Sequence, residues 1–176
     1  MQFMIELMRQ DYESNEGLTI DEIVANSFMS FFMEFGTCSS TLTFALYNLA
    51  IHEDIQDAAR KEVEAILKKF DGKFSYEAIN DFELLDRIIA ETLRQYPPVA
   101  NVSRVATRNF SLPNGALLPK GTSVIVPVYA FHHDARIFPD PEKFDPSRFL
   151  DDSKSKRHPF AYLPFGEGPR ICIGRR

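Results

Sequence analysis

The residues best suited to chemistry lie near the end of the chain, around Cys172. This cysteine stands between two isoleucines and is flanked by Gly168 and Gly174. Glycines let the backbone approach another group closely, and backbone N–H groups together with a nearby Arg170 favour the thiolate form of a cysteine. A thiolate held in this way is a metal ligand or a nucleophile. The alternative is a buried cysteine that packs as a small apolar side chain.

The pattern around this cysteine is Phe-x-x-Gly-x-Arg-x-Cys-x-Gly. Five fixed positions match by chance on the order of once in a million windows of average composition. The segment resembles the haem-binding loop of the cytochrome P-450 family. The resemblance implies that the Cys172 thiolate ligates the iron of haem b, and that the haem is also bound by the other residues of the pattern, Phe165, Gly168, Arg170 and Gly174.

Two further motifs support the resemblance. Glu91-x-x-Arg94 has the i, i+3 spacing at which two side chains pair on a helix, although such a pair alone is usually solvated and weak. The segment Pro146-x-Arg148-Phe149 is similar to a family segment whose arginine joins the helix pair. The resemblance implies a buried structural triad of Glu91, Arg94 and Arg148 that supports the cysteine loop.

A long apolar segment contains Thr37, which aligns with the family's oxygen-site threonine. The family usually has Ala-Gly-x-acid-Thr, whereas here Met33-Glu34 replaces Ala-Gly and Gly36 replaces the acid. The resemblance makes Thr37 and Glu34 candidate catalytic residues. Either Glu34 delivers protons in place of the missing acid, or its side chain obstructs the oxygen site. For Thr37 alone, the alternative is a hydroxyl bonded to the carbonyl one turn earlier.

A candidate strand after two prolines contains Arg104. The resemblance places this arginine, with Arg170, at the two haem propionates, and two guanidinium groups suit two carboxylates. On sequence alone, a surface strand residue is the favoured interpretation of Arg104. The resemblance also places the preceding segment, Val99–Ser103, along the substrate pocket, with Ala100 and Val102 as candidate substrate contacts.

The elements that must position these residues follow from periodicity and from capping signals. Thr19 with Glu22 three residues later predicts a capping box, and the apolar segment from about 23 to 51 predicts a long helix. Its length invites a transmembrane interpretation. Its internal polar residues, Glu34 among them, favour instead a helix buried through the centre of a protein.

Shorter elements are predicted in the rest of the chain. Seven prolines between Pro127 and Pro169 predict an irregular stretch from about Tyr129 onward. An irregular stretch of this length inside a compact domain is usually functional. Further helices are expected at 2–10, 54–70 and 81–95, and strands at 102–106, 110–112 and 123–128.

Composition excludes several classes of protein. The 176 residues include 20 Lys and Arg against 25 Asp and Glu, a net charge of −5 with no broad basic face, so nucleic-acid binding is not expected. Two distant cysteines exclude a disulfide framework and a tetrahedral zinc site, and they suit a reducing compartment. None of the four histidines has metal-ligand spacing, and we interpret all four as ordinary: His52, His132, His133 and His158.

The resemblance covers nearly the whole chain and implies a mainly α fold with small β-sheets, the C-terminal portion of the cytochrome P-450 fold. Residues 1–176 would form a partial domain that lacks the N-terminal half and the helix after the cysteine loop. The implied function is a haem-dependent monooxygenase that inserts one oxygen atom of O₂ into an apolar small molecule, a xenobiotic or an endogenous lipid-like compound. Electrons would come from NADPH through a flavoprotein reductase.

The segment from Phe160 to Arg170 is most similar to insect microsomal members of the detoxification type. This implies the cytosolic face of the endoplasmic reticulum membrane, reached through an N-terminal anchor that this chain does not contain. The fragment alone is expected to be inactive. Two alternatives remain: a non-catalytic truncated remnant of such an enzyme, and a helical membrane or interaction protein built on residues 23–51.

Overall fold

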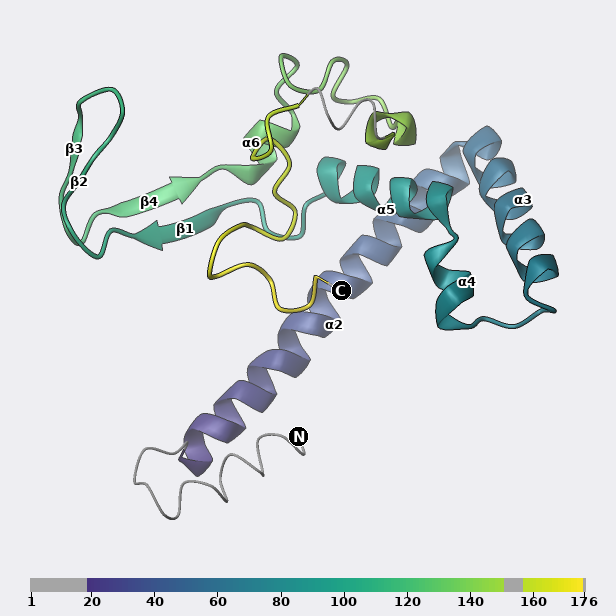
Figure 1. The fold of residues 1–176 in the computed structure, drawn as a ribbon, viewed down its shortest axis with the longest axis horizontal. Coiled ribbons are helices and arrows are strands. Elements are labelled where there is room, and N and C mark those ends of the chain that lie inside the picture. Colours follow the sequence, from purple (N-terminus) through teal and green to yellow (C-terminus); the bar gives the residue numbers. More distant parts are fainter. Residues whose placement is uncertain (1–18, 151–156, 176) are drawn as a thin grey trace. The chain divides into compact units, whose positions relative to one another are not determined.

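The computed structural model of the protein describes residues 19–150 and 157–175. The chain divides into two compact units, Met1–Ser40 and Thr41–Arg176. Helices dominate, and the described strands pair in two small antiparallel sheets (Figure 1). The expected fold class, mainly α with small β-sheets, is therefore confirmed. The helix predicted at 2–10 lies outside the described residues.

Helix α2, Ile20–Ile51, begins at the predicted capping box. The Thr19 backbone nitrogen donates to Glu22 Oε2 at 2.7 Å, and the Glu22 backbone nitrogen donates to Thr19 Oγ1 at 3.2 Å. These bonds satisfy N–H groups that a helix start otherwise leaves unpaired. They also favour the ionised carboxylate, so the pKa of Glu22 lies below its ordinary value.

Within this chain, burial along α2 is confined to its last two turns. Only Ala45 and Asn48 are buried, while large apolar side chains such as Phe31, Phe32 and Phe35 are exposed. Within the unit Met1–Ser40, the described part of the chain contains no second element that could cover these side chains. None of the described helices is both long enough and apolar enough to cross a membrane.

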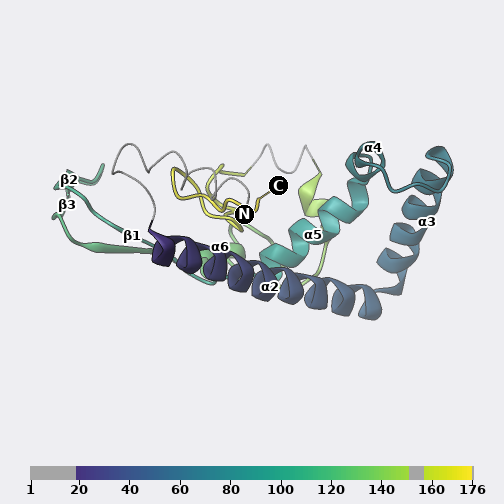
Figure 2. The same ribbon diagram turned by 90° about the horizontal axis from the view of Figure 1, so that it is seen from below.

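Helices α3 (Glu53–Lys69), α4 (Tyr76–Asn80) and α5 (Glu83–Gln95) follow one another in the second unit (Figure 2). Helix α4 was not predicted, because five residues are too few to show a helical period. Apolar side chains hold the three helices together in two clusters. The buried members are Ala59, Ile88 and Phe144 in one cluster, and Ile66, Ala78 and Phe82 in the other.

The sheets lie close to their predicted positions. Strand β1 (Val102–Val105) pairs antiparallel with β4 (Ser123–Val126), and Arg104 lies opposite Val124. Strands β2 (Phe110–Ser111) and β3 (Leu117–Leu118) form a two-residue ladder closed by the predicted Asn-Gly turn, whose glycine has φ +84°. Strand β3 was not predicted, because a two-residue strand carries no alternation.

The stretch beyond β4 is less irregular than predicted. Helix α6, Val128–His132, follows Pro127 directly, and the 3-10 helix η1 spans Pro146–Phe149. Asp145 caps η1 by accepting a hydrogen bond from the Ser147 backbone nitrogen. In the described residues, α5 has contacts with both α6 and η1. These two short helices therefore bring residues distant in the sequence to the face of α5.

Candidate functional site

Helix α5 carries the predicted pair Glu91 and Arg94 on its buried face. Arg94 donates from Nε to Glu91 Oε2 at 2.7 Å and from Nη2 to Glu91 Oε1 at 2.9 Å. Both side chains have zero exposure. Arg94 also donates to the backbone oxygens of His132 at 2.9 Å and Pro141 at 2.7 Å. The pair is thus a desolvated bidentate ion pair rather than the solvated helix pair that the spacing alone would suggest.

The structure brings Arg148, the third predicted member, to the same carboxylate. Its Nε lies 3.4 Å from Glu91 Oε1, and its Nη2 donates to the Asp140 backbone oxygen at 2.9 Å. The Asp145 backbone nitrogen, at the start of η1, donates to Glu91 Oε1 at 2.9 Å. One buried carboxylate therefore holds two arginines and the beginning of η1. The supporting role of this cluster stays a proposal.

Glu62 of α3, which sequence reasoning missed, holds the start of α5. Its Oε1 accepts from the backbone nitrogens of Glu83 at 3.0 Å and Leu84 at 2.7 Å, and its Oε2 accepts from Leu85 at 3.0 Å. Phe82, the residue at the N-cap of α5, makes no side-chain cap bond. A negative charge at a helix N-terminus is stabilising. No local signal reveals this contact, because more than twenty residues separate the partners.

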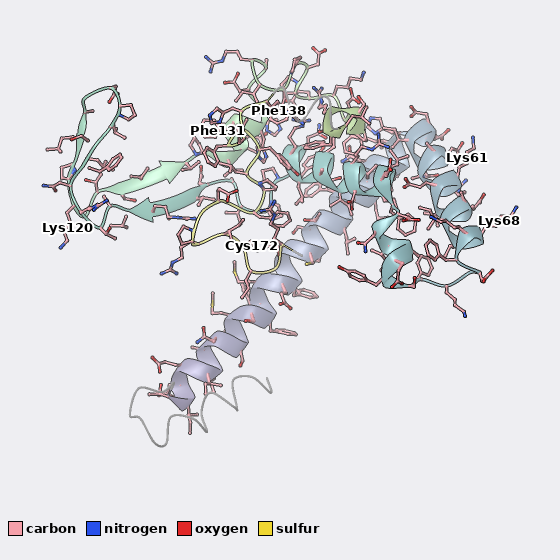
Figure 3. The ribbon with its side chains drawn as sticks, viewed as in Figure 1. Lys61, Lys68, Lys120, Phe131, Phe138 and Cys172 are labelled. Atoms are coloured by element: carbon pink, nitrogen blue, oxygen red, sulfur yellow. The ribbon has the colours of Figure 1, made fainter. Side chains whose placement is uncertain are left out.

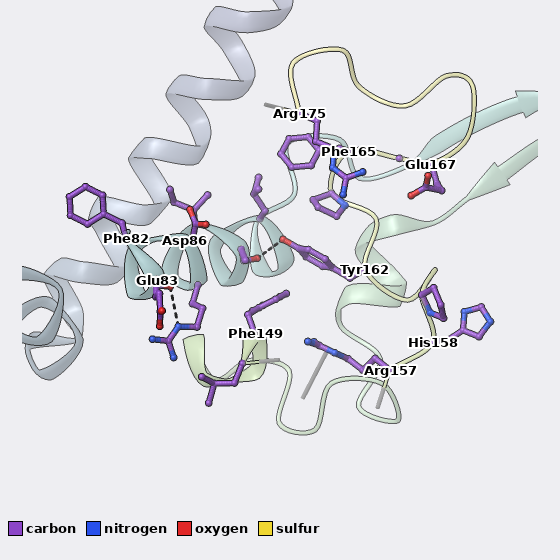
Figure 4. A pocket seen from close by; sticks show the side chains of 18 of the residues that line it. Phe82, Glu83, Asp86, Phe149, Arg157, His158, Tyr162, Phe165, Glu167 and Arg175 are labelled. Carbon is purple, nitrogen blue, oxygen red and sulfur yellow. Dashed lines mark hydrogen bonds between the residues drawn. The ribbon is translucent and has the colours of Figure 1, made fainter. Parts of the chain in front are cut away.

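An aromatic group covers the other side of α5. Tyr162 donates from its hydroxyl to the Ala90 backbone oxygen at 2.8 Å (Figure 4), and its ring stacks on His132 with centroids 5.1 Å apart. Burial raises the pKa of Tyr162 above its ordinary value. The Arg157 guanidinium lies 4.9 Å from the ring centres of both Phe138 and Phe149. Burial lowers the pKa of Arg157.

The cysteine loop is shaped by its own backbone. The Cys172 nitrogen donates to the Phe165 oxygen at 2.9 Å, and the Ile171 nitrogen donates to the Gly168 oxygen at 3.0 Å. Gly168 has φ +84°, a conformation that side-chain-bearing residues rarely adopt, which explains the glycine at this motif position. A Cβ added at Gly174 would lie 3.9 Å from Cys172 Sγ, in ordinary contact. The Cys172 side chain is exposed (Figure 3).

The guanidinium of Arg104, on β1, contacts the backbone of this loop. Its Nη2 lies 3.5 Å from the backbone oxygens of Glu167 and Arg170, and its Nη1 donates to the Ser103 oxygen at 2.8 Å. The side chain of Arg170 is exposed. The structure therefore brings together the guanidinium of Arg104 and the backbone of the loop that carries Cys172. The role of Arg104 at a haem propionate stays a prediction.

The other predicted residues make local contacts of their own. Thr37 donates from Oγ1 to the Met33 oxygen at 2.7 Å, the bond one turn back that its residue type favours, and Glu34 is exposed. Both lie on the part of α2 that belongs to the unit Met1–Ser40. Ala100 is exposed and accepts from the Tyr129 nitrogen at 3.0 Å, while Val102 is half-buried opposite Val126.

A cavity of about 770 Å³ lies between α5 and the start of the cysteine loop (Figure 4). Its lining includes Ile89 and Leu93 of α5, and Phe165, Glu167 and Arg175 of the loop region. Cys172, Ala100 and Val102 are not among the lining residues. The cavity is therefore not the substrate pocket that the sequence resemblance implies.

The whole chain, residues 1–176, matches the sequence profile of the family described as Cytochrome P-450. Two similar proteins of Drosophila melanogaster are the probable cytochrome P-450 6a18, 50% identical over 92% of this chain, and the probable cytochrome P-450 6a13, 44% identical over 100% of it. Cytochrome P-450 6j1 of Blattella germanica is 43% identical over 100% of this chain.

This chain covers 32%, 36% and 34% of those three relatives, respectively, so it spans about a third of their length. The relatives are insect proteins, as the cysteine-loop segment predicts. The fold segment, the buried Glu91–Arg94 pair and the profile match over the whole length agree with one another. The chain belongs to the cytochrome P-450 family.

Proposed function

We propose that the complete protein carrying this chain is a haem-dependent monooxygenase. It inserts one oxygen atom of O₂ into an apolar small molecule, and the other atom leaves as water. The electrons come from NADPH through a flavoprotein reductase. Family membership over the whole chain supports this proposal. The cysteine loop is the observation that carries it, because the loop exposes the Cys172 thiol and two of its backbone oxygens accept from Arg104 Nη2.

The donor set around Cys172 fits a haem better than a bare metal ion. In residues 19–150 and 157–175, no group of three or more His, Cys, Asp or Glu side chains could hold a metal. A structural zinc needs four protein ligands and a catalytic zinc needs three. A lone thiolate suits an iron whose macrocycle already supplies four nitrogen ligands. The loop therefore offers a single thiolate that would hold a haem iron.

Each loop residue has a distinct part in this proposal. Cys172 would hold the iron through its sulfur, and the backbone bond from its nitrogen to the Phe165 oxygen holds the loop closed. Gly168 and Gly174 leave the loop surface free of bulky side chains, and Arg104 and Arg170 would hold the haem propionates. When bound, the haem supplies the oxidative chemistry, and a thiolate ligand favours O–O cleavage.

The buried cluster of Glu91, Arg94 and Arg148 has a structural part in this proposal. It joins α5 to the segment before the cysteine loop through Asp145 and the backbone oxygen of His132. None of the three side chains needs to touch a substrate for this role. Loss of one charge would leave the others unpaired in a buried place, so folding and haem binding would fail before turnover changed.

By the same resemblance, the Thr37 hydroxyl would hydrogen-bond dioxygen or a water at the haem and would help deliver protons there. The position of Glu34, three residues earlier on the same helix face, decides how well this works. We favour obstruction of the oxygen site over proton delivery by Glu34. The test is the double change Glu34→Gly with Gly36→Glu, in which product formed per NADPH consumed should rise. Loss of turnover in Glu34→Gln, with a well-coupled parent, would instead identify Glu34 as the proton relay.

Resemblance also supplies the remaining parts of the proposal. Ala100 and Val102 border the substrate, and the complete protein works at the cytosolic face of the endoplasmic reticulum membrane. Residues 1–176 form part of one cytochrome P-450 domain. The direct test of the reaction uses the complete protein, a reductase, NADPH and isotopically labelled O₂. The product should carry one labelled oxygen atom, and a product labelled only from water would overturn the proposal.

A further inference from the structure

His132, interpreted as ordinary from its spacing, is completely buried at the end of α6. Its Nδ1 lies 3.2 Å from the Arg94 backbone oxygen, and its Nε2 lies 3.0 Å from the Leu163 backbone nitrogen. The two residues are joined by a second bond, because Arg94 Nη1 donates to the His132 backbone oxygen at 2.9 Å. One imidazole therefore joins the end of α5 to the segment that enters the cysteine loop.

The two partners determine the protonation of the ring. A carbonyl oxygen only accepts and a backbone N–H only donates, so the proton must be on Nδ1 and Nε2 must be bare. The neutral ring is the form that satisfies both bonds, and burial lowers the pKa of His132 to about 4. Tyr162 stacks on the ring and Phe138 meets its edge, which keeps water away from both bonds.

A short series of backbone bonds runs from this ring to Cys172. The Leu163 nitrogen is held by His132, and the Leu163 oxygen accepts from the Gly166 nitrogen at 3.1 Å. Phe165, the residue between them in the turn, accepts from the Cys172 nitrogen at 2.9 Å. The turn that receives the cysteine therefore has one of its ends fixed by the His132 Nε2 bond.

We propose that His132 is a positioning residue for Cys172. Its imidazole joins the buried Arg94 to the Leu163 backbone, and so fixes the turn that holds the cysteine. The acceptor at Nε2 is the atom on which the loop depends. The donor at Nδ1 holds the ring in place against α5. This inference uses the proposed function only for the identity of the group that Cys172 binds.

Three substitutions separate the two bonds of the ring. His132→Gln can place an amide oxygen near the Nε2 position and keep the acceptor, and His132→Asn can place an amide nitrogen near Nδ1 and keep the donor. His132→Phe keeps ring volume and removes both bonds. The matched control is His133→Gln, because the adjacent His133 bonds only locally, from Nδ1 to the Tyr129 oxygen at 2.9 Å.

The measurement is residue-resolved hydrogen exchange of the backbone amides in the complete protein. Loss of one hydrogen bond should speed exchange about tenfold where that bond protects the amide. We expect this acceleration at both Leu163 and Cys172 in the Asn and Phe variants. Exchange in the Gln variant and in the His133 control should stay within about threefold of the parent.

Three results would overturn the inference. In the first, the Phe variant keeps parental protection, which would make His132 a packing residue. In the second, Asn and Gln give equal exchange, a comparison that decides the matter even if the Phe variant fails to fold. In the third, Leu163 accelerates and Cys172 does not. Amide exchange needs no bound haem, so these results remain readable if the proposed function fails.

Discussion

Two ion pairs in this protein share the i, i+3 helix spacing and differ in burial. Glu91 and Arg94 on α5 have zero exposure, whereas the side chains of Asp57 and Arg60 on α3 are 61% and 60% exposed. Glu91→Gln removes the negative charge from the buried ion pair, and Asp57→Asn removes it from the exposed ion pair. Because the substitution is chemically the same, any difference in stability reports burial and the surrounding bonds.

The expected magnitudes follow from what each carboxylate holds. Glu91 accepts two bonds from Arg94 and one from the Asp145 nitrogen, and it lies 3.4 Å from Arg148 Nε. A glutamine there turns an N–H donor towards a guanidinium and leaves two buried positive charges unbalanced, which costs about 3–5 kcal/mol. Solvent screens the exposed pair, so Asp57→Asn should cost at most about 0.5 kcal/mol.

Urea unfolding of the complete protein, followed by circular dichroism, measures both changes. With a slope of roughly 1–3 kcal/mol per molar urea, a cost of about 3–5 kcal/mol means that Glu91→Gln should lower the midpoint by about 1–5 M. Asp57→Asn should move the midpoint by a few tenths of a molar at most. Equal shifts for the two variants would refute the reasoning. A Glu91→Gln protein with the parental midpoint and altered turnover alone would also refute it.

Three further outcomes follow from the geometry. Arg94→Lys should unfold at lower urea than the parent, because an ammonium cannot reproduce the bidentate bonds to Glu91, and a parental midpoint would contradict this. Glu62→Ala should cost about 1–2 kcal/mol through loss of the α5 cap, against little change for the exposed Glu64→Ala, so equal midpoints for these two would exclude the cap. Stability should fall as pH drops from about 6.5 to about 4, by up to about 3 kcal/mol, because the unfolded chain binds a proton that buried His132 does not. His132→Gln should remove this slope, and an unchanged slope would assign it to another group.

The elements with strong local signals could be predicted from the sequence. The capping box at Thr19 and Glu22 marks the start of α2. A content rich in Ala, Glu and Lys marks α3, and apolar spacing marks α5, each within a few residues. The short elements α4, α6 and β3 were not predicted, because they contain too few residues to show a period.

The residues of the candidate site likewise divide into those that a sequence pattern predicted and those that it did not. The family pattern pointed to Glu91, Arg94 and Arg148, and the structure brings these three together. Glu62 and His132 were missed, because their partners lie 21–23 and 31–38 residues away and their residue types are unremarkable at those positions. The predicted burial of α2 through the centre of a protein stays a prediction, because its apolar side chains are exposed in a chain that spans about a third of its relatives' length.

Thiolate ligation by Cys172 is the central claim, and the carbon-monoxide difference spectrum of the reduced complete protein tests it most directly. Parent and Cys38→Ser proteins should show the absorption band of a thiolate-ligated haem, since Cys38 has no part in the site. Cys172→His should bind haem without that band and without monooxygenation. A thiolate band in the Cys172→His protein, or its loss in Cys38→Ser, would contradict the assignment of Cys172 as the iron ligand.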